Sequence, residues 1–491
     1  MRSLRRAVPL ALLVLLALPA AGMAQDGPTV EDVASRVDTT WVIVAAVLVM
    51  FMQAGFAFLE IGFSRGKNVG AVVAKILTNF SISALVWWAV GFGIAFGGAA
   101  KIAGDSGFFF GFGDHLNASY FTETVYATEN INGAFASFTF FQFVFCAVSL
   151  AIVWGTTLER IKFIAYPIYA VVFSAVIYPL VAHWIFGGGW LSTLGAGVQD
   201  FAGSTVVHLT GATGALAALL LLGPRKGKYG PDGKARAIPG HNMPLFGLGV
   251  LILWLGWFGF NPGSTLGTLD GRFAEIVVVT NLAAAAGVVG ALITSRLLNK
   301  TLDVGMIGNG AIAALVAITA PSGYVEFWAA PIIGVVAGVI VVVGVLMFER
   351  LRLDDPVGAL SAHGLAGIWG TLSCGIFTSP RLASYNGIGE EGLVYGNVSQ
   401  LGVQAVGVAA AFALVFVLSF ATFWAIKKAF GLRVESEEED AGLDIAEHGM
   451  YGYPEQFIPV PELEGYGAAP TARAPIAPSA YSTTREEVPA T

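Results

Sequence analysis

Long apolar runs constrain the fold of this chain more than any other feature. A membrane-spanning helix needs about 20 consecutive, mostly apolar residues. Eleven runs of about that length lie near residues 40–63, 73–98, 134–155, 163–186, 201–222, 242–262, 275–298, 302–320, 325–348, 358–378 and 400–426. Charged residues make up only 12% of the 491 residues, against about 25% in a soluble protein. The sequence therefore predicts an all-α polytopic protein whose eleven transmembrane helices lie in a lipid bilayer.

Lysine and arginine are concentrated in alternate loops between these runs. One set of loops contains Arg65, Lys67, Arg160, Lys162, Arg225, Lys226, Lys228, Lys234, Arg236, Arg296, Lys300, Arg350, Arg352, Lys427, Lys428 and Arg433. The other set contains Arg36, Lys101, Arg272 and Arg381. Because loops rich in Lys and Arg stay in the cytoplasm, we predict a multi-pass protein of the cell (inner) membrane. Its N-terminus is expected outside and its C-terminus in the cytoplasm.

The first 24 residues have the pattern of a secretory signal peptide. A stretch with three arginines precedes the apolar residues 8–18, and Gly22-Met23-Ala24 resembles a cleavage site. We expect residues 1–24 to be removed, so that the mature chain begins near Gln25. The alternative is that this stretch remains as an uncleaved first helix.

The rest of the chain divides by composition. Residues 25–38 form the predicted periplasmic N-terminus, and 39–428 the predicted transmembrane domain, which includes a long outer loop at 99–133. After Lys428 the composition becomes acidic and then rich in Pro and Ala. We predict a cytoplasmic C-terminal regulatory segment at 429–453 and a disordered tail at 454–491.

Several classes of function find no support in the sequence. No nucleophile–base pair or metal-ligand spacing is present, so we predict neither an enzyme nor a bound metal or cofactor. The formal net charge of −7 and the absence of a basic patch argue against nucleic acid as a partner. Cys146 and Cys374 both lie inside apolar runs. We expect them to be buried core residues, and the sequence leaves open whether a disulfide joins them.

Two histidines lie inside predicted spans, where an ionisable side chain is costly and indicates a functional site. His208 lies in the fifth span and His363 in the tenth. The pattern Asp-x-x-Gly-x-x-x-x-His precedes both, beginning at Asp200 and at Asp355. One such histidine would most simply be satisfied by a neighbouring helix, but the repeated pattern favours a functional pair.

The two histidines occupy matching positions in two blocks of five spans. Span five starts outside and span ten starts inside, so the two blocks have opposite orientations. Inverted repeats of this kind place a shared site near the bilayer midplane, where the repeats meet. We therefore predict inverted five-helix repeats in which His208 and His363 meet at the centre, with an extra C-terminal helix outside the repeat.

Aromatic residues recur on two of the predicted spans. Phe141 and Phe145 lie one turn apart on the third span, while Trp257 and Phe260 lie on the sixth, with Ser264 just beyond. Aromatic stripes usually pack in a core or face lipid. An aromatic face nevertheless attracts a desolvated cation by about 2 kcal/mol, whereas a charge at the bilayer centre costs at least about 2.5 kcal/mol. Beside two buried histidines, this composition favours a small cation that can release a proton.

Longer motifs occur in order between residues 39 and 453. They are Gly55-Phe-Ala-Phe-Leu-Glu60-Ile-Gly62-Phe-Ser-Arg65-Gly-Lys67-Asn68, Glu159-Arg160-Ile, Ala182-His183 before Gly187-Gly-Gly189, Asp200-Phe-Ala-Gly-Ser-Thr-Val-Val-His208, Gly256-Trp257-Phe-Gly-Phe260-Asn261, Asp354-Asp355-Pro356, His363-Gly364, and the C-terminal Gly442-Leu-Asp444-Ile-Ala-Glu-His448-Gly449-Met-Tyr451-Gly-Tyr453. Together they resemble the Amt/MEP/Rh family of ammonium transporters, specifically its Amt branch.

The resemblance implies a homotrimer with one pore per subunit that takes ammonium or methylammonium. It places an outer substrate site at Phe141, Phe186, Ser264, Trp257 and Asp200, with Asp200 supporting the site through structure and charge rather than by direct ligation. It also implies a phenyl gate at Phe145 and Phe260, and pore or proton-relay roles for His208 and His363.

One position departs from the family pattern. The family usually has Trp before the three glycines that follow the fourth span, whereas this chain has Phe186, with Trp184 two residues earlier. Because a phenyl ring binds cations less well than an indole, we expect a weaker outer site.

The expected mechanism is recruitment of ammonium at the outer site, deprotonation, and conduction of ammonia with the proton relayed separately. The resemblance also implies a PII-type signalling protein as a partner at the cytoplasmic face. Two alternatives remain open, namely an ammonium sensor or receptor with little flux, and a gas channel like those of the Rh branch. The Amt-type tail argues against the second.

Overall fold

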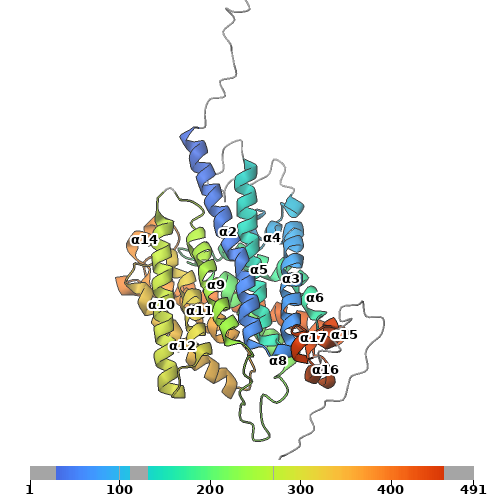
Figure 1. Ribbon diagram of the computed structural model, residues 1–491. Coiled ribbons are helices and arrows are strands. Elements are labelled where there is room, and N and C mark those ends of the chain that lie inside the picture. Colours follow the sequence, from blue (N-terminus) through green and yellow to red (C-terminus); the bar gives the residue numbers. More distant parts are fainter. Residues whose placement is uncertain (1–28, 99, 111–130, 269, 458–491) are drawn as a thin grey trace, which may run out of the picture.

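The computed structural model describes residues 29–98, 100–110, 131–268 and 270–457. The predicted signal peptide, residues 25–28, part of the predicted outer loop (111–130) and residues 458–491 of the predicted tail lie outside the described residues. The described chain forms a bundle of mostly upright helices (Figure 1). Within it, β-structure is limited to two isolated bridges. The prediction of an all-α protein is confirmed.

Nine helical segments of the described chain are long and apolar enough to cross a membrane. They correspond to predicted spans one to seven, nine and eleven. Their helices are α2 (Val30–Phe63), α3 and α4 (Val69–Val86 and Phe92–Phe96), α5 (Ile131–Trp154), α6 and α7 (Ala165–Val172 and Tyr178–Ile185), α8 (Thr210–Leu222), α9 (Met243–Gly263), α10 (Arg272–Asn299), α12 (Ala329–Arg350) and α15 (Ser399–Phe430).

The predicted eighth and tenth spans are shorter helices. The eighth, α11 (Val304–Thr319), has 16 residues, and every residue from Asn309 to Thr319 is buried. The tenth combines the π-helical segment η9 (Leu360–Leu365) with α13 (Ala366–Phe377). A helix enclosed by other helices does not have to present the full apolar length that lipid contact requires. All eleven predicted runs therefore occur as helices, two of them shorter than expected.

The first helix begins well before the predicted start near residue 40. Thr29 and Asp32 form a capping box at its N-terminus, in which the Thr29 hydroxyl accepts from the Asp32 N–H and the Asp32 carboxylate accepts from the Thr29 N–H. The first turns of α2 contain both polar and apolar residues. Hydrophobicity alone therefore placed the start of this helix too late, because the capping box determines it.

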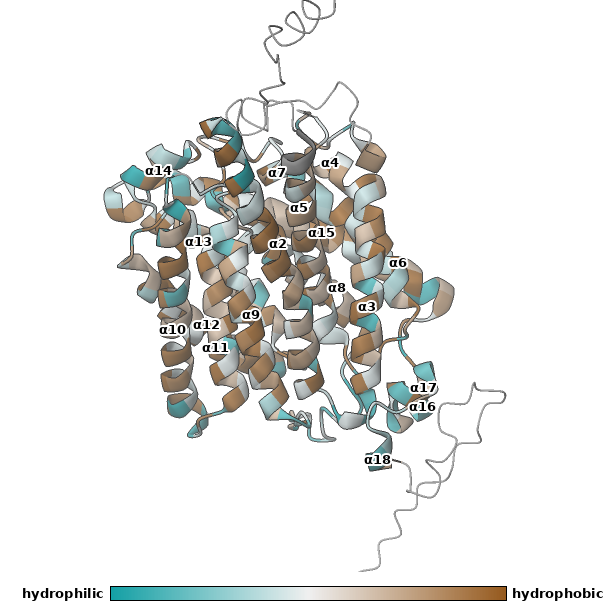
Figure 2. Ribbon diagram, turned by 45° about the horizontal axis from the view of Figure 1, so that its top comes forward, coloured by the Kyte–Doolittle hydropathy of each residue, from teal (hydrophilic) through white to brown (hydrophobic). Residues whose placement is uncertain are grey.

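The two ends of the bundle differ in their short helices. One end carries α14 (Pro380–Asn386), and the other carries α16 (Ser436–Ala441), α17 (Leu443–His448) and α18 (Pro454–Phe457). We call these the α14 end and the α17 end. Hydrophobic residues cover much of the long helices, and hydrophilic residues gather at both ends (Figure 2). Large apolar side chains such as Leu77, Val289 and Val417 are exposed, as helices that contact lipid require.

Corresponding elements of the two predicted five-span blocks pack against each other. The first span, α2, packs along the sixth, α9. The π-helical segment η7 (Ser204–Leu209), which begins the fifth span, contacts η9, which begins the tenth. The eleventh span, α15, packs on α8 and α13 outside this pairing. This arrangement agrees with an inverted repeat and brings the two histidine-bearing segments together.

Both cysteines are free thiols inside the bundle. Cys146 lies on α5 and Cys374 on α13, and both are buried. Their sulfur atoms lie near Ser83 Oγ (3.7 Å) and Gly370 O (3.8 Å), respectively. The expectation of two buried core residues is confirmed, and no disulfide joins them.

Candidate functional site

The two intramembrane histidines face each other inside the bundle. Nδ1 of His363 lies 3.3 Å from Nδ1 of His208, and the ring centroids are 5.3 Å apart with an angle of 20° between the planes. Both residues are buried, with 5% of His363 and 0% of His208 exposed. A hydrogen bond between two Nδ1 atoms requires one imidazole to donate and the other to accept. The pair that the sequence predicted to meet is therefore in direct contact.

The aspartate of each Asp-x-x-Gly-x-x-x-x-His pattern caps the helical segment that carries the histidine. The Asp200 carboxylate accepts four hydrogen bonds of 2.7–2.9 Å from the N–H groups of residues 203–206. Asp355 accepts from the N–H groups of Gly358 (3.0 Å) and Leu360 (2.7 Å). Carboxylates at such positions satisfy N–H groups that the first helical turn leaves free. Each aspartate thus fixes the start of the π-helical segment that carries a histidine.

The glycine of each pattern has a backbone conformation that side chains rarely allow. Gly203 has φ of 114° and Gly358 has φ of 77°, in the region that glycine enters without steric cost. The chain turns there from the aspartate loop into η7 or η9. Single π-helical turns inside α-helices are frequent at functional sites. The spacing within the pattern is therefore explained by its three fixed residues: the aspartate caps the helix, the glycine forms the turn, and the histidine lies within the π-helical segment.

Four predicted aromatic and hydroxyl residues form one column. The rings of Phe145 and Phe260 stack with centroids 4.0 Å apart and planes at 17°, and Phe141 lies 4.6 Å from Phe145. A Cβ atom on Gly263 would lie 2.9 Å from the Phe141 ring, so glycine is needed beside it. The next residue, Ser264, donates its hydroxyl to Phe260 O at 2.8 Å. The hydroxyl oxygen of Ser264 retains lone pairs for a donor.

Trp257 joins this column to the histidines. Its ring lies 5.4 Å from the His208 ring with planes at 18°, and the Phe260 ring lies 5.5 Å from the His208 ring. The indole Nε1 donates to Thr319 Oγ1 at 2.9 Å, which fixes the orientation of the fully buried indole. Phe260 and Trp257 therefore separate Ser264 from the histidine pair.

Asp200 and Phe186 are the two remaining predicted residues of the outer site. The Asp200 carboxylate accepts the four backbone hydrogen bonds described above, and Asp200 is 4% exposed. Phe186 follows α7 as its C-cap residue and is half-buried against the core. Within the described part of the chain, no ring contact joins Phe186 to the column. The Trp184 indole donates to Ile102 O at 2.9 Å and packs near Trp190.

The helix directions order these residues along the bundle. Ser264 is the residue that follows the end of α9. Gly267, three residues later, lies near Asp38 in the first turns of α2, so Ser264 lies toward the end of the bundle at which α2 begins. Going toward the α17 end, Phe141 and Phe145 follow on α5, and Phe260 and Trp257 on α9 in reverse order. The histidine pair comes next. The candidate path therefore runs from Ser264, through stacked phenyl rings, to two imidazoles.

Beyond the histidines, the structure adds residues that the sequence analysis did not single out. The Phe56 ring lies 6.2 Å from the His363 ring. A cavity of about 20 Å³ is lined by Phe56, Glu60, Asn309 and His363 together with apolar residues. Glu60 is an ionisable residue inside a predicted span, as His208 is. The criterion that selected the histidines would therefore also have selected Glu60, and Lys75 with which it pairs.

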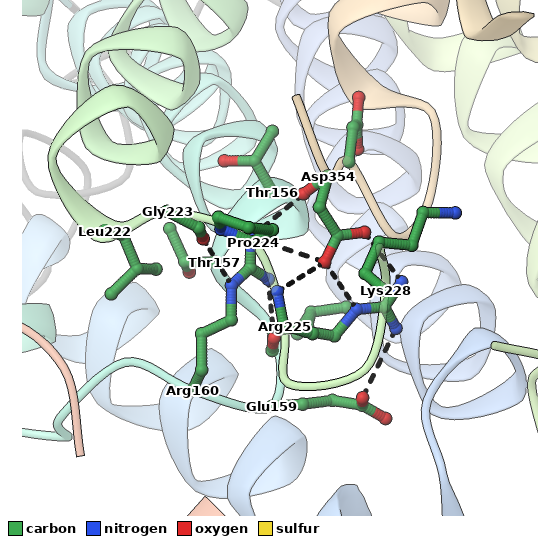
Figure 3. A network of polar contacts seen from close by, with 12 residues as sticks. Thr156, Thr157, Glu159, Arg160, Leu222, Gly223, Pro224, Arg225, Lys228 and Asp354 are labelled. Carbon is green, nitrogen blue, oxygen red and sulfur yellow. Dashed lines mark hydrogen bonds and ion pairs between the residues drawn. The ribbon is translucent and has the colours of Figure 1, made fainter. Parts of the chain in front are cut away.

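A buried ionic network holds the α17 end (Figure 3). Arg225 donates to both carboxylate oxygens of Asp354, at 2.9 and 3.0 Å, and reaches Glu159 at 3.3 Å. Arg160 donates to Asp354 O (2.9 Å) and to Gly223 O (3.0 Å). The network joins the loops after α5, α8 and α12, which are far apart in the chain.

The carboxylates of this network stay ionised at neutral pH. Burial alone would raise the pKa of Asp354, but hydrogen bonds from Arg225 and the charges of Arg160 and Arg225 lower it to about 2. Burial likewise opposes ionisation of Glu159, but the charges of Arg225 and Arg65 lower its pKa. The ionic contacts therefore persist across the physiological pH range.

The segment after α15 docks on the same end. Asp444 Oδ1 accepts from Ala71 N at 2.9 Å, and Asp444 Oδ2 accepts from Gly452 N at 3.1 Å. Lys226 N donates to Glu439 Oε1 at 2.7 Å. These contacts tie α17 to the start of α3 and α16 to the loop after α8. The predicted regulatory segment is therefore ordered, and helix α18 continues it beyond residue 453.

Comparisons with known proteins agree with this architecture. The chain matches the model of the Ammonium Transporter Family over residues 40–453. It is 45% identical over 477 residues to the ammonium transporter Amt2 of Archaeoglobus fulgidus, covering 93% of this chain and 98% of that one.

Two solved structures are also similar. One titled Sensor Amt Protein has a TM-score of 0.76 and 37% identity, with 85% of this chain and 100% of that chain covered. Mep2 of Candida albicans has a TM-score of 0.73 and 29% identity, with 85% and 90% covered. The family match covers residues 40–453, which include the histidine pair and helices α16 and α17, and the chain therefore belongs to the ammonium transporter family.

Proposed function

We propose that this protein transports ammonium, by binding it at an outer site, removing a proton, and conducting ammonia while the proton passes separately. The observation that carries the proposal is the buried contact between His208 and His363, 3.3 Å from Nδ1 to Nδ1, directly behind an aromatic column. A dry aromatic path resists an intact cation, whereas ammonia is neutral. The histidine pair supplies groups that can both accept and donate the proton.

The outer site uses Phe141 and Ser264, supported by Phe186, Trp257 and Asp200. The Ser264 hydroxyl donates to its own helix, so its oxygen accepts a hydrogen bond from the ammonium ion. The Phe141 face adds cation–π attraction. Asp200 acts through backbone contacts and through its negative charge, without touching the ion.

The gate is the stacked pair Phe145 and Phe260. At a centroid distance of 4.0 Å the two rings leave no open channel between them, so passage requires one ring to rotate. The Phe260 ring of the gate and the Trp257 ring both lie within 5.5 Å of the His208 ring. The ion therefore loses its water before it meets the first imidazole, and transfer of a proton to a neighbouring base becomes favourable.

The protein acts as a homotrimer in the inner membrane, with its N-terminus outside and the α17 end in the cytoplasm. The alternation of basic loops supports this orientation, because the basic loops and the docked segment gather at the α17 end. A PII-type protein binds there and blocks the exit. Pull-down with the organism's PII protein, with and without nucleotide, tests that partner, and no binding under any condition would reject it.

The experiment for transport is ammonium-evoked current in liposomes that contain the purified protein. We expect current with ammonium and methylammonium, and none with sodium. Equal permeation of sodium and ammonium would contradict the proposed site. Flux of ammonia without current would favour a gas channel like those of the Rh branch.

An ammonium sensor with little flux is the second candidate function. The observation in its favour is the similarity to the structure titled Sensor Amt Protein. The relative at 45% identity is named a transporter, which supports transport. Ammonium binding measured by calorimetry, together with neither current nor uptake of labelled methylammonium, would favour the sensor.

A further inference from the structure

A buried ion pair lies inside the helical bundle beyond the histidines. Glu60 on α2 pairs with Lys75 on α3, and only 2% of each side chain is exposed. Within the described residues, this is the only ion pair that Lys75 makes. Removing two charges from water costs several kcal/mol per ion, and their attraction often fails to offset that cost. Two apolar side chains would join α2 to α3 at least as well, so bracing these helices is a poor explanation for the pair.

The location of Glu60 suggests a different role. Glu60 lies one helical turn from Phe56, whose ring is 6.2 Å from that of His363. Glu60 and His363 line the same cavity of about 20 Å³, where Glu60 is the only carboxylate among the lining residues. A cavity of that size and polarity accepts about one water molecule. A proton that leaves His363 on this side therefore meets Glu60 as its first base.

A second, larger pocket adjoins this cavity. This pocket of about 320 Å³ shares Asn309 and Val357 with the cavity, and its lining includes Arg225, Lys228 and Asp303. Asn309 donates to Val357 O at 2.9 Å, which holds the boundary between the two spaces. His363 and Glu60 therefore share a small cavity that borders the larger pocket at Asn309 and Val357.

We propose that Glu60 is the proton-relay residue on the α17 side of the histidine pair, with Lys75 as its fixed counter-charge. This deepens the proposed transport function and rests on it. The proton passes from the imidazolium of His363 to the Glu60 carboxylate, directly or through one water molecule, and His363 becomes neutral again. Glu60 then releases the same proton into the larger pocket, so one proton enters and one leaves.

Lys75 makes this step transient. When Glu60 carries the proton, the buried ammonium of Lys75 has lost its counter-charge, and an unpaired buried charge is strongly unfavourable. Release of the proton toward the α17 end restores the pair. The pair thus accepts a proton and cannot hold it, which is the property that a relay needs.

The test compares ammonium-evoked currents in liposomes for wild type and three variants. E60Q/K75Q removes both charges together, E60K/K75E exchanges them, and E60D keeps the carboxylate on α2. We expect E60D to keep most of the current, and E60Q/K75Q to lose about tenfold or more. The exchange variant keeps the ion pair but moves the carboxylate to α3, whose residue 75 does not line the cavity. It is therefore expected to fold with reduced current.

The controls distinguish a proton-relay role of Glu60 from a purely structural role. E326Q at the α14 end removes a carboxylate that pairs with Arg381 and should leave the current unchanged. Each variant is checked by gel filtration and thermal unfolding. Substitution of D₂O for H₂O should slow the residual current of E60D more than that of wild type. A folded E60Q/K75Q or E60K/K75E with undiminished current would overturn the proposal.

The wild-type protein provides a measurement that does not depend on any variant folding. Time-resolved infrared difference spectra recorded after rapid addition of ammonium should show a protonated carboxyl band that decays as the proton is released, and absence of that transient band would reject the relay. If wild type carries no ammonium current, the proposed transport function fails. If wild type conducts and the variants conduct equally, only the role of Glu60 fails.

Discussion

The Nδ1 atoms of His208 and His363 lie 3.3 Å apart, although 155 residues separate the two histidines in the chain. Each histidine lies in a π-helical segment that begins beside a capping aspartate. The hydrogen bond between the imidazoles has a direction, because one Nδ1 donates and the other accepts. A proton passed through both rings reverses that direction. The pair must therefore reset before it can pass the next proton.

Replacing the histidines tests their part in proton transfer. H208A and H363A each remove one imidazole, so we expect ammonium-evoked current to fall on the order of 100-fold, the usual contribution of a positioned proton-transfer group. The double variant leaves a neutral hole and should fall no further, because either loss already breaks the pair. Gel filtration confirms an intact oligomer in each case. A double variant with undiminished, equally selective current would make the histidines structural.

Restoring the family's indole at position 186 should strengthen the outer site. Cation–π attraction is larger for Trp than for Phe, and the whole interaction is worth about 0.5–1 kcal/mol at an exposed site. F186W is therefore expected to lower the ammonium concentration for half-maximal current, by at most about fivefold. The matched control is F412W, which changes an exposed residue on α15 and should have no effect. Unchanged affinity in F186W would place Phe186 outside the binding site.

Neutralising Asp200 should destabilise the bundle. The carboxylate accepts four backbone N–H groups, and an amide at this position turns its own N–H₂ toward two of these donors. We expect D200N to lower the free energy of unfolding by about 3 kcal/mol. Thermal unfolding in detergent measures this, with E437Q on the exposed face of α16 as a neutral control. A D200N protein of wild-type stability with lost ammonium binding would assign Asp200 an electrostatic role only.

The ionic network at the α17 end predicts a dependence of stability on pH. The pKa of Asp354 is lowered from 3.8 to about 2, so its contribution is fully present above pH 3.8 and is lost as pH falls toward 2. By linkage this contribution is about 2 kcal/mol. The unfolding midpoint of wild type should therefore fall more steeply with acidification in this window than that of D354N. Parallel curves for the two proteins would show that Asp354 contributes nothing.

Loss of Asp444 should release the C-terminal segment. Its carboxylate accepts from Ala71 N and Gly452 N, which ties α17 to α3. The free energy needed to open this segment locally should fall by about 1–3 kcal/mol. We therefore expect protease to cleave D444A between α15 and α18 at least about fivefold faster than wild type. The helical bundle itself should unfold at an unchanged temperature. Equal cleavage rates would show that the other docking contacts suffice.

Much of the fold and part of the site were predictable. Hydrophobic runs gave all eleven helices, and the repeated motif gave His208 and His363, because run length and motif spacing are local properties of the chain. The start of α2 was placed too late, because a capping box and not hydrophobicity determines it. The place of Phe186 in the outer site stays a prediction from the resemblance, because Phe186 is the C-cap residue of α7 and no ring contact among the described residues joins it to the column. Its position depends on how the loop after α7 folds.

The sequence by itself determined an all-helical membrane protein, the order of its spans and the two motif-borne histidines, because apolar length and motif spacing are encoded within single segments. Only the tertiary structure decided that Glu60 shares a cavity with His363 and that Arg225 joins Asp354 to Glu159. These contacts connect side chains from helices and loops that are distant in the chain. Their distances follow from how the helices pack, and no local pattern contains that information.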